Sequence, residues 1–145
     1  MGRRSRADAR GSDGVILIDT SAWIEFLRDT GSPICEEVDR LLAEEMAICD
    51  PVRMEVLAGA RDEAHLRQLR GLLARATVLP TGTADYESAA ALYRACRRRG
   101  ETVRKLIDCL IAAVAVRESV PILHADADFD VLDRHTALQI HGVGS

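Results

Sequence analysis

The amino-acid sequence predicts a single α/β domain with a mainly parallel central sheet and helices on both faces, a three-layer α/β/α arrangement. Short apolar runs alternate along the chain with longer segments of helical periodicity, and this alternation is typical of βαβ units. A length of 145 residues, 48% of them hydrophobic, is sufficient for one buried core. Aromatic residues make up only 3% of the chain, so we expect that core to consist of Leu, Ile, Val and Ala.

The first 14 residues differ in composition from the rest of the chain. They are rich in Gly, Ser, Arg and Asp and lack the apolar region of a secretory signal. We expect residues 1–14 to be a disordered or artefactual N-terminal arm and residues 15–145 to form the domain. The longest apolar run, residues 106–116, contains an aspartate and is too short to span a bilayer, so we expect no membrane association.

In the first half of the chain, most predicted elements begin with a recognisable signal. Residues 15–19 predict a buried strand, and Thr20 and Ser21 are expected to cap the helix after it. Two later helices begin with a capping residue followed by a proline, at Ser32-Pro33 and Asp50-Pro51. The predicted elements are a strand at 15–19, helices at 22–28 and 33–45, a strand at 46–49, and helices at 50–59 and 62–75.

In the second half, glycine and proline mark several element ends. Pro80 closes a weak strand, Gly100 ends an Ala-rich helix, and Thr102 is expected to cap the next helix. The predicted elements are a strand at 77–79, helices at 83–99 and 103–118, a strand at 120–124, a helix at 129–135 and a strand at 138–140. The alternating order supports a mainly parallel sheet.

Acidic residues stand at the ends of two predicted strands. Asp19 ends the first strand, and Asp126 and Asp128 follow the strand at 120–124. Ligands of open α/β sheets bind outside the carboxyl ends of the strands. We therefore expect these three side chains to lie at one edge of the sheet.

Two further acids interrupt apolar helical segments. Asp108 shares its helical face with small alanines, and a carboxylate buried there requires compensation. An ion pair with Arg104, or exposure near the helix start, is the ordinary explanation of Asp108. Glu55 lies among apolar residues of the helix at 50–59, and on its own is better explained as a solvated side chain.

Considered together, these acids indicate a metal site. Like charges brought close resist shared ionisation, so such a cluster needs a cation or protons. Oxygen ligands without a nearby set of His or Cys favour Mg²⁺, Mn²⁺ or Ca²⁺ over zinc. The four cysteines have no zinc-binding spacing, so we expect reduced thiols and a cytoplasmic location.

Other site chemistries fit the sequence less well. Asp126, Asp128 and Asp130 match the first ligands of a calcium-binding EF-hand, but that loop needs glycine at Val131 and glutamate at Ala137. A phosphatase with an aspartyl nucleophile stays open as an alternative, although its motif would stand close to the C-terminus. Phosphate-binding glycine loops and the G-x-S-x-G and H-E-x-x-H motifs are absent.

One segment of the chain is strongly basic, although the formal net charge of the whole chain is −4. Residues 94–105 contain six basic residues and one glutamate, directly before the helical segment with Asp108. Such a patch can bind the phosphate groups of a substrate, although arginines at residues 97–99 also suit a helix C-terminus. The residues expected to contact phosphates are Arg97, Arg98, Arg99 and Arg104.

Four acidic segments follow one another in a specific order: ILIDTSAWIEFL, PVRMEVLAGA, TVRKLIDCLIAAVAV and ILHADADFD. Together they resemble a PIN domain over residues 15 to about 140, and more narrowly a VapC-type toxin, the ribonuclease of a bacterial toxin–antitoxin pair. The resemblance implies an endoribonuclease that hydrolyses RNA phosphodiester bonds at a Mg²⁺ site, with Mn²⁺ as an alternative ion. It also implies a VapB-type antitoxin partner and a homodimer.

The resemblance assigns roles to particular residues. The positions matching the family's acids are Asp19, Glu55, Asp108 and Asp126, with Asp128 as an additional acid. Of these, Asp19, Asp108 and Asp126 are implied as metal ligands, whereas Glu55 and Asp128 are implied to act through water. Thr20 and Ser21 are candidates for a supporting hydroxyl.

The first predicted helix carries more apolar residues than one buried stripe needs: Trp23, Ile24, Phe26 and Leu27. This helix therefore either packs in the core or offers a dimer or antitoxin surface.

Three other functions remain as alternatives to the endoribonuclease. They are a non-catalytic RNA- or partner-binding module, a structure-specific DNA nuclease and a phosphatase.

Overall fold

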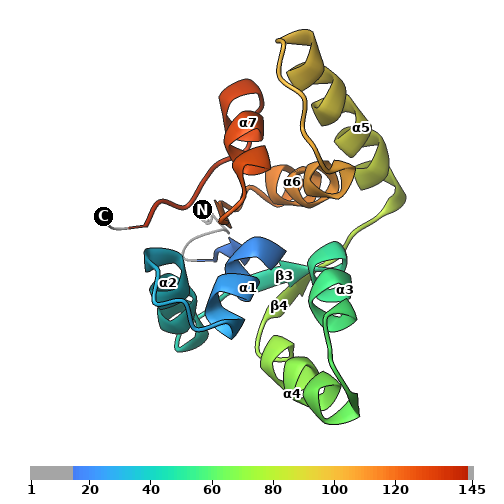
Figure 1. The fold of residues 1–145 in the computed structure, drawn as a ribbon. Helices are drawn as coiled ribbons and strands as arrows, with labels where there is room; N and C mark the ends of the chain where they lie inside the picture. The colour runs from blue at the N-terminus through green and yellow to red at the C-terminus, as the bar shows by residue number, and fades with distance from the viewer. Residues whose placement is uncertain (1–14, 144–145) are drawn as a thin grey trace, which may run out of the picture.

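A four-stranded parallel sheet forms the centre of the computed structural model, which describes residues 15–143 (Figure 1). The strand order is β4-β3-β2-β5, and every neighbouring pair is parallel. The strands are β2 (Leu17–Ile18), β3 (Ala47–Cys49), β4 (Thr77–Leu79) and β5 (Ile122–Leu123). The predicted α/β class with a parallel sheet is confirmed, whereas the N-terminal arm predicted for residues 1–14 lies outside the described residues.

Seven helices surround this sheet in the described part of the chain. They are α1 (Thr20–Leu27), α2 (Pro33–Leu42), α3 (Asp50–Ala58), α4 (Glu63–Leu73), α5 (Thr83–Arg98), α6 (Leu106–Glu118) and α7 (Ala127–His135). Helices α5, α6 and α7 pack against one another, and α1 packs against α2 and α3 (Figure 1). This arrangement agrees with the predicted three layers.

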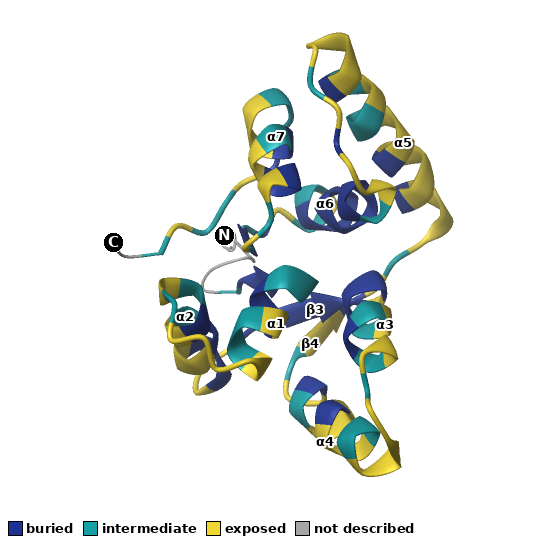
Figure 2. Ribbon diagram, in the orientation of Figure 1, coloured by how far each residue is buried: buried dark blue, intermediate teal, exposed yellow. Residues whose placement is uncertain are grey.

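Helix α6 is the most buried helix of the fold. Figure 2 shows it in dark blue over most of its length, and every residue from Asp108 to Ala115 is buried. Its apolar residues surround the whole helix because it packs against α3 and α7 as well as α5. This burial also explains why Cys109 lies in the core. All four cysteines are free and buried: Cys35, Cys49, Cys96 and Cys109.

Several helix starts differ from the prediction. Thr20 and Ser21 belong to α1 itself, and Asp19 is its N-cap, because the Asp19 carboxylate accepts a hydrogen bond from the Ser21 amide. Thr102 is not the cap of the helix that follows it, because α6 begins only at Leu106, after an extended Lys105. The predicted cap at Ser32 is confirmed, since its hydroxyl accepts from the Cys35 amide at 3.0 Å.

Two further corrections concern α3 and the chain end. Asp50 is the first residue of α3 rather than its cap, which is Cys49. The predicted strand at 138–140 is reduced to one parallel bridge between Ile140 and Ile122. Helix α5 ends as predicted, since Gly100 has a φ of +88°, a left-handed conformation that glycine adopts without a steric penalty.

The apolar surplus on α1 divides between core and surface. Trp23 is fully buried and contacts Phe26 edge-on, with 6.4 Å between the ring centroids. Ile24 and Leu27 are exposed. The core explanation therefore holds for Trp23, and the two aliphatic residues remain available as a surface.

Candidate metal centre

The sheet topology brings two distant acids to one edge. Strands β2 and β5 are parallel neighbours, and the Asp19 amide donates to the Leu123 carbonyl at 3.0 Å. Asp19 therefore leaves the sheet beside the segment that follows β5 and contains Asp126. The expectation that these acids share the carboxyl edge is met because the strand ends are in register.

Asp19 is buried, and its environment favours the protonated form. Its Oδ2 accepts from the Ser21 amide at 2.9 Å and from the Ser21 hydroxyl. Among the described residues, no donor reaches its Oδ1. Burial raises the pKa of Asp19 to about 6, and the Ser21 hydrogen bonds only partly oppose this rise.

Asp108 lies in the first turn of α6 and is more strongly perturbed. Burial, a proton shared with Asp128 and the charge of Asp19 together raise the pKa of Asp108 to about 8. Its Oδ2 is buried and accepts no hydrogen bond from the part of the chain described, although the Lys105 ammonium is 3.3 Å away. An orphaned buried oxygen of this kind is a candidate cation ligand.

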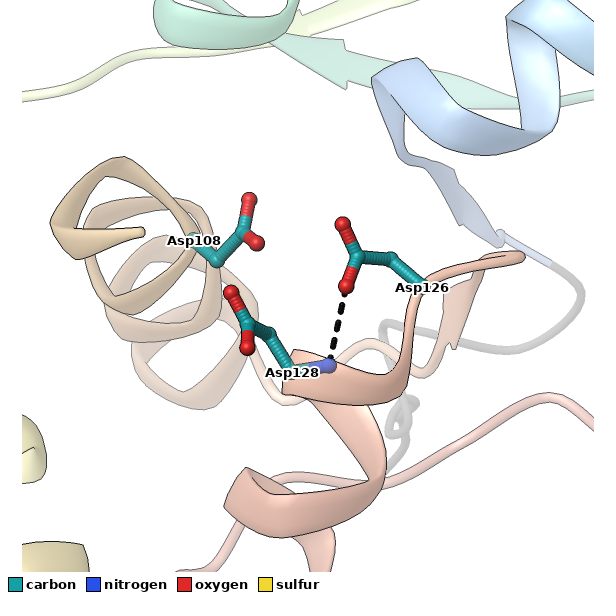
Figure 3. A group of neighbouring side chains, drawn as sticks. All are labelled: Asp108, Asp126 and Asp128. Carbon is teal, nitrogen blue, oxygen red and sulfur yellow. Dashed lines mark hydrogen bonds between the residues drawn. The ribbon is translucent and has the colours of Figure 1, made fainter. Parts of the chain in front are cut away.

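Asp126 and Asp128 complete a compact group with Asp108 (Figure 3). Asp126 is the N-cap of α7, and its Oδ1 accepts from the Asp128 amide at 2.9 Å. Each of the three acids offers a carboxylate oxygen, and these oxygens lie within 4.8 Å of one another. The helix begins two residues earlier than predicted because Asp126 caps it.

Asp128 is held by the backbone that precedes α6. Its oxygens accept from the amides of Arg104 and Lys105, both at 3.0 Å. Burial alone would raise the pKa of Asp128, but these donors and the Arg104 side chain lower it. Asp128 therefore fixes the position from which α6 starts.

The Arg104 side chain does not form an ion pair with Asp108, so the ion pair that the sequence suggested as an ordinary explanation of this buried acid is wrong. Its guanidinium contacts Asp126 at 3.2 Å and Asp128 at 3.3 Å instead. Residues 103–105 are not helical: the chain bends at Arg104 and is extended at Lys105, and this directs Arg104 across to α7. The sequence suggested Arg104 as a phosphate or site contact, whereas it gave no role to Lys105, which also lies among the acids.

Glu55 and the two hydroxyls form a second branch of the site. The Thr20 hydroxyl donates to Glu55 Oε1 at 2.6 Å, across from α1 to α3. The Ser21 hydroxyl donates to Asp19 and accepts from the Ala125 amide at 2.9 Å. Each hydroxyl therefore supports one acid, and Ser21 also links α1 to the segment after β5.

The donor set suits a hard divalent cation. Within the described residues, Asp19 Oδ1 and Asp108 Oδ2 are buried and accept no hydrogen bond. These two oxygens and the three converging carboxylates fit an ion that prefers oxygen ligands. The compact group contains Asp128 where the sequence suggested Asp19. Asp19 lies near the group: burial and the hydrogen bond with Asp128 raise the pKa of Asp108 most, and the charge of Asp19 raises it further.

The predicted RNA-binding arginines fall into two groups. Arg97, Arg98 and Arg99 are exposed at the end of α5, and the Arg97 guanidinium lies 5.5 Å from the centre of the Tyr93 ring. Of these four arginines, only Arg104 contacts the acids of the site.

No helix in residues 15–143 is long and apolar enough to cross a membrane.

Comparisons with known proteins agree with this geometry. The PIN domain model matches residues 16–135. A VapC ribonuclease of Mycobacterium bovis and ribonuclease VapC11 of Mycobacterium tuberculosis are each 51% identical over 129 residues, covering 86% of this chain and 96% of each relative.

Solved structures share the fold at lower sequence identity. VapBC2 from Rickettsia felis, bound to a promoter DNA fragment, has a TM-score of 0.72 and 16% identity, covering 90% of this chain and 99% of that one. VapC20 of Mycobacterium tuberculosis, a sarcin–ricin loop cleaving toxin, has a TM-score of 0.61 and 18% identity, covering 79% and 92%. The chain therefore belongs to the PIN domain family and, within it, to the VapC-type proteins.

Proposed function

We propose that this protein is the toxin of a toxin–antitoxin pair, an endoribonuclease that hydrolyses RNA phosphodiester bonds at a Mg²⁺-dependent acidic site, with Mn²⁺ as an alternative ion. The observation that carries the proposal is 51% identity across nearly the whole length of relatives named as ribonucleases. The converging carboxylates supply a matching chemistry.

Three acids are proposed to hold the ion: Asp19, Asp108 and Asp126. A divalent ion bound there would neutralise phosphate charge and lower the pKa of a bound water. Asp19 and Asp108 each have a buried oxygen that accepts no hydrogen bond from residues 15–143, which supports direct ligation by these two acids. Glu55, hydrogen-bonded to Thr20, is proposed to orient water, and Asp128 to position the start of α6.

RNA binding is proposed to use the exposed cations around this edge. The Arg104 side chain is 69% exposed although it contacts two acids, so it can also reach a phosphate. Residues 97–99 offer a second set of phosphate contacts at the end of α5. Their role in the proposal is to offset the repulsion between RNA and the acidic site.

A VapB-type antitoxin is the proposed partner, and a groove between α1, α3 and α4 suits it. This groove has a volume of about 600 Å³ and contains the exposed Ile24 and Leu27, with Glu55 at one side. An amphipathic segment laid there would cover apolar surface and reach the acidic site.

A homodimer is also proposed, through a different surface. A cavity of about 530 Å³ between α3, α5 and α6 has a mostly apolar lining. Met54, Tyr86 and Leu106 are exposed at its rim, and a second copy of the chain would cover them.

The function is tested by incubating RNA with wild type or Asp19→Asn, in Mg²⁺ or in EDTA. Cleavage only by wild type with Mg²⁺ is expected, and Asp130→Asn, an exposed acid of α7, serves as the matched control. Cleavage that ignores both EDTA and Asp19→Asn contradicts the proposal.

Three other outcomes favour the alternatives. RNA binding without cleavage favours a binding module, and cleavage of structured DNA alone favours a DNA nuclease. Release of phosphate from a small phosphomonoester favours a phosphatase.

A further inference from the structure

Lys105 is the only lysine among the 145 residues, whereas the chain has 18 arginines. Its side chain lies inside the group of three acids. The ammonium hydrogen-bonds to Asp126, and it lies 3.3 Å from Asp108 Oδ2 and 3.7 Å from Asp128 Oδ2. One positive charge therefore contacts all three carboxylates at once.

This position overlaps the proposed metal site, because Asp108 and Asp126 are two of the three proposed ligands of the ion. The carboxylate oxygens of Asp108, Asp126 and Asp128 lie within 4.8 Å of one another, which leaves space for one cation among them. Mg²⁺ binds carboxylate oxygens at about 2.1 Å. An ammonium in contact with Asp108 and Asp126 and an ion bound to the same oxygens exclude each other.

The backbone of Lys105 is held by hydrogen bonds, whereas its side chain can move into solvent. The Asp128 carboxylate accepts a hydrogen bond from the Lys105 amide at 3.0 Å and another from the adjacent Arg104 amide at the same distance. The Lys105 side chain is 47% exposed and has four flexible methylene groups. The ammonium can therefore move into solvent by rotation of the side chain alone.

We propose that Lys105 is a tethered counter-ion that occupies the cation position of the metal-free protein and leaves it when a divalent ion binds. It holds three neighbouring carboxylates together before the ion arrives, and it competes with the ion for them. Lys105 is thus a positioning residue that sets metal affinity. This inference rests on the metal site of the proposed function.

The first test observes wild type without any substitution. Lysine labelled with ¹⁵N at Nζ gives a single side-chain resonance, because the chain has one lysine. During a Mg²⁺ titration this resonance is expected to shift saturably, and the hydrogen exchange of the ammonium is expected to accelerate. A resonance that stays unchanged while Mg²⁺ binds overturns the proposal.

The second test measures Mn²⁺ affinity by electron paramagnetic resonance for wild type, Lys105→Met and Arg40→Met. Removing the competing ammonium is expected to tighten Mn²⁺ binding roughly tenfold, the size of one charge-assisted hydrogen bond. Arg40→Met is the matched control: Arg40 lies on α2 and also contacts two carboxylates, Glu37 of the same helix and Glu44 just after its end. It removes the same charge and is expected to leave Mn²⁺ affinity within about twofold of wild type, since Arg40 makes no contact with the acids of the site.

The outcomes separate this inference from the proposed function. Equal Mn²⁺ affinity in wild type and Lys105→Met overturns the counter-ion and leaves the metal site standing. Absence of Mn²⁺ binding in all three proteins overturns both. Binding by Lys105→Met alone supports strong competition by the ammonium.

Discussion

Replacing Asp108 by Asn is expected to stabilise the metal-free protein, although it removes a proposed metal ligand. Asp108 is buried, and its pKa is raised to about 8, first by burial. An unfolded aspartate has a pKa near 3.8. Because the folded pKa is the higher one, folding is favoured at low pH, and this contribution is lost as pH rises towards 8.

The size of the effect follows from the two pKa values. One group contributes at most about 1.4 kcal/mol per pH unit, and the slope flattens near the folded pKa. Between pH 5 and pH 8, the ionisation of Asp108 therefore lowers the free energy of unfolding by roughly 3–4 kcal/mol. The asparagine side chain of the variant does not titrate, and its amide can donate to Asp128 as the protonated acid does.

The assay is urea unfolding in EDTA at several pH values from 5 to 8. The difference between Asp108→Asn and wild type is expected to grow with pH in favour of the variant, and added Mg²⁺ is expected to stabilise only wild type. Asp85→Asn is the matched control, because Asp85 is equally buried but pairs with Arg117 at 2.8 Å, which lowers its pKa. That variant should lose a constant amount over this range. A pH-independent difference for Asp108→Asn refutes the reasoning.

Three further predictions concern the hydroxyl that supports Asp19, the arginines proposed to bind RNA, and the packing of α6. Ser21→Ala removes the hydroxyl that joins Asp19 to Ala125, and is expected to cost about 1 kcal/mol in urea unfolding and at least roughly tenfold in RNA cleavage; full activity would contradict its supporting role. Alanine at residues 97–99 is expected to weaken RNA binding and to reduce the slope of log affinity against log salt by roughly 2, whereas an unchanged slope in filter binding excludes them as phosphate contacts. Ile111→Ala, at a fully buried position of α6, is expected to lower the free energy of unfolding by about 2–5 kcal/mol; a loss below about 1 kcal/mol would contradict tight packing there.

The sequence predicts the fold well because alternation and apolar runs are local signals. The parallel order of strands and the burial of α6 follow from them directly. Helix starts are less predictable, because a carboxylate competes with a hydroxyl for the same backbone amides. Asp19 takes the cap position that Thr20 and Ser21 were expected to fill, and Asp126 caps α7, which begins two residues before its predicted start.

The candidate site is predictable as a set of acids but not as a set of contacts. Strand ends indicate that Asp19 and Asp126 meet, since parallel strands share an edge. The contacts of Arg104 and Lys105 depend on three non-helical residues before α6, and nothing local in the sequence distinguishes these from the first turn of a helix. That difference decides which acid each cation contacts.

The proposed metal ligands also begin three helices. Asp19 caps α1, Asp126 caps α7, and Asp108 lies in the first turn of α6, so three helix N-termini direct their partial positive charges at one small volume. Natural selection on the chemistry and on the folding of these helices therefore acts on the same side chains. An alanine substitution removes both functions together, whereas asparagine keeps an oxygen that can still cap. Asparagine variants are accordingly the better choice for trapping the protein with uncleaved RNA.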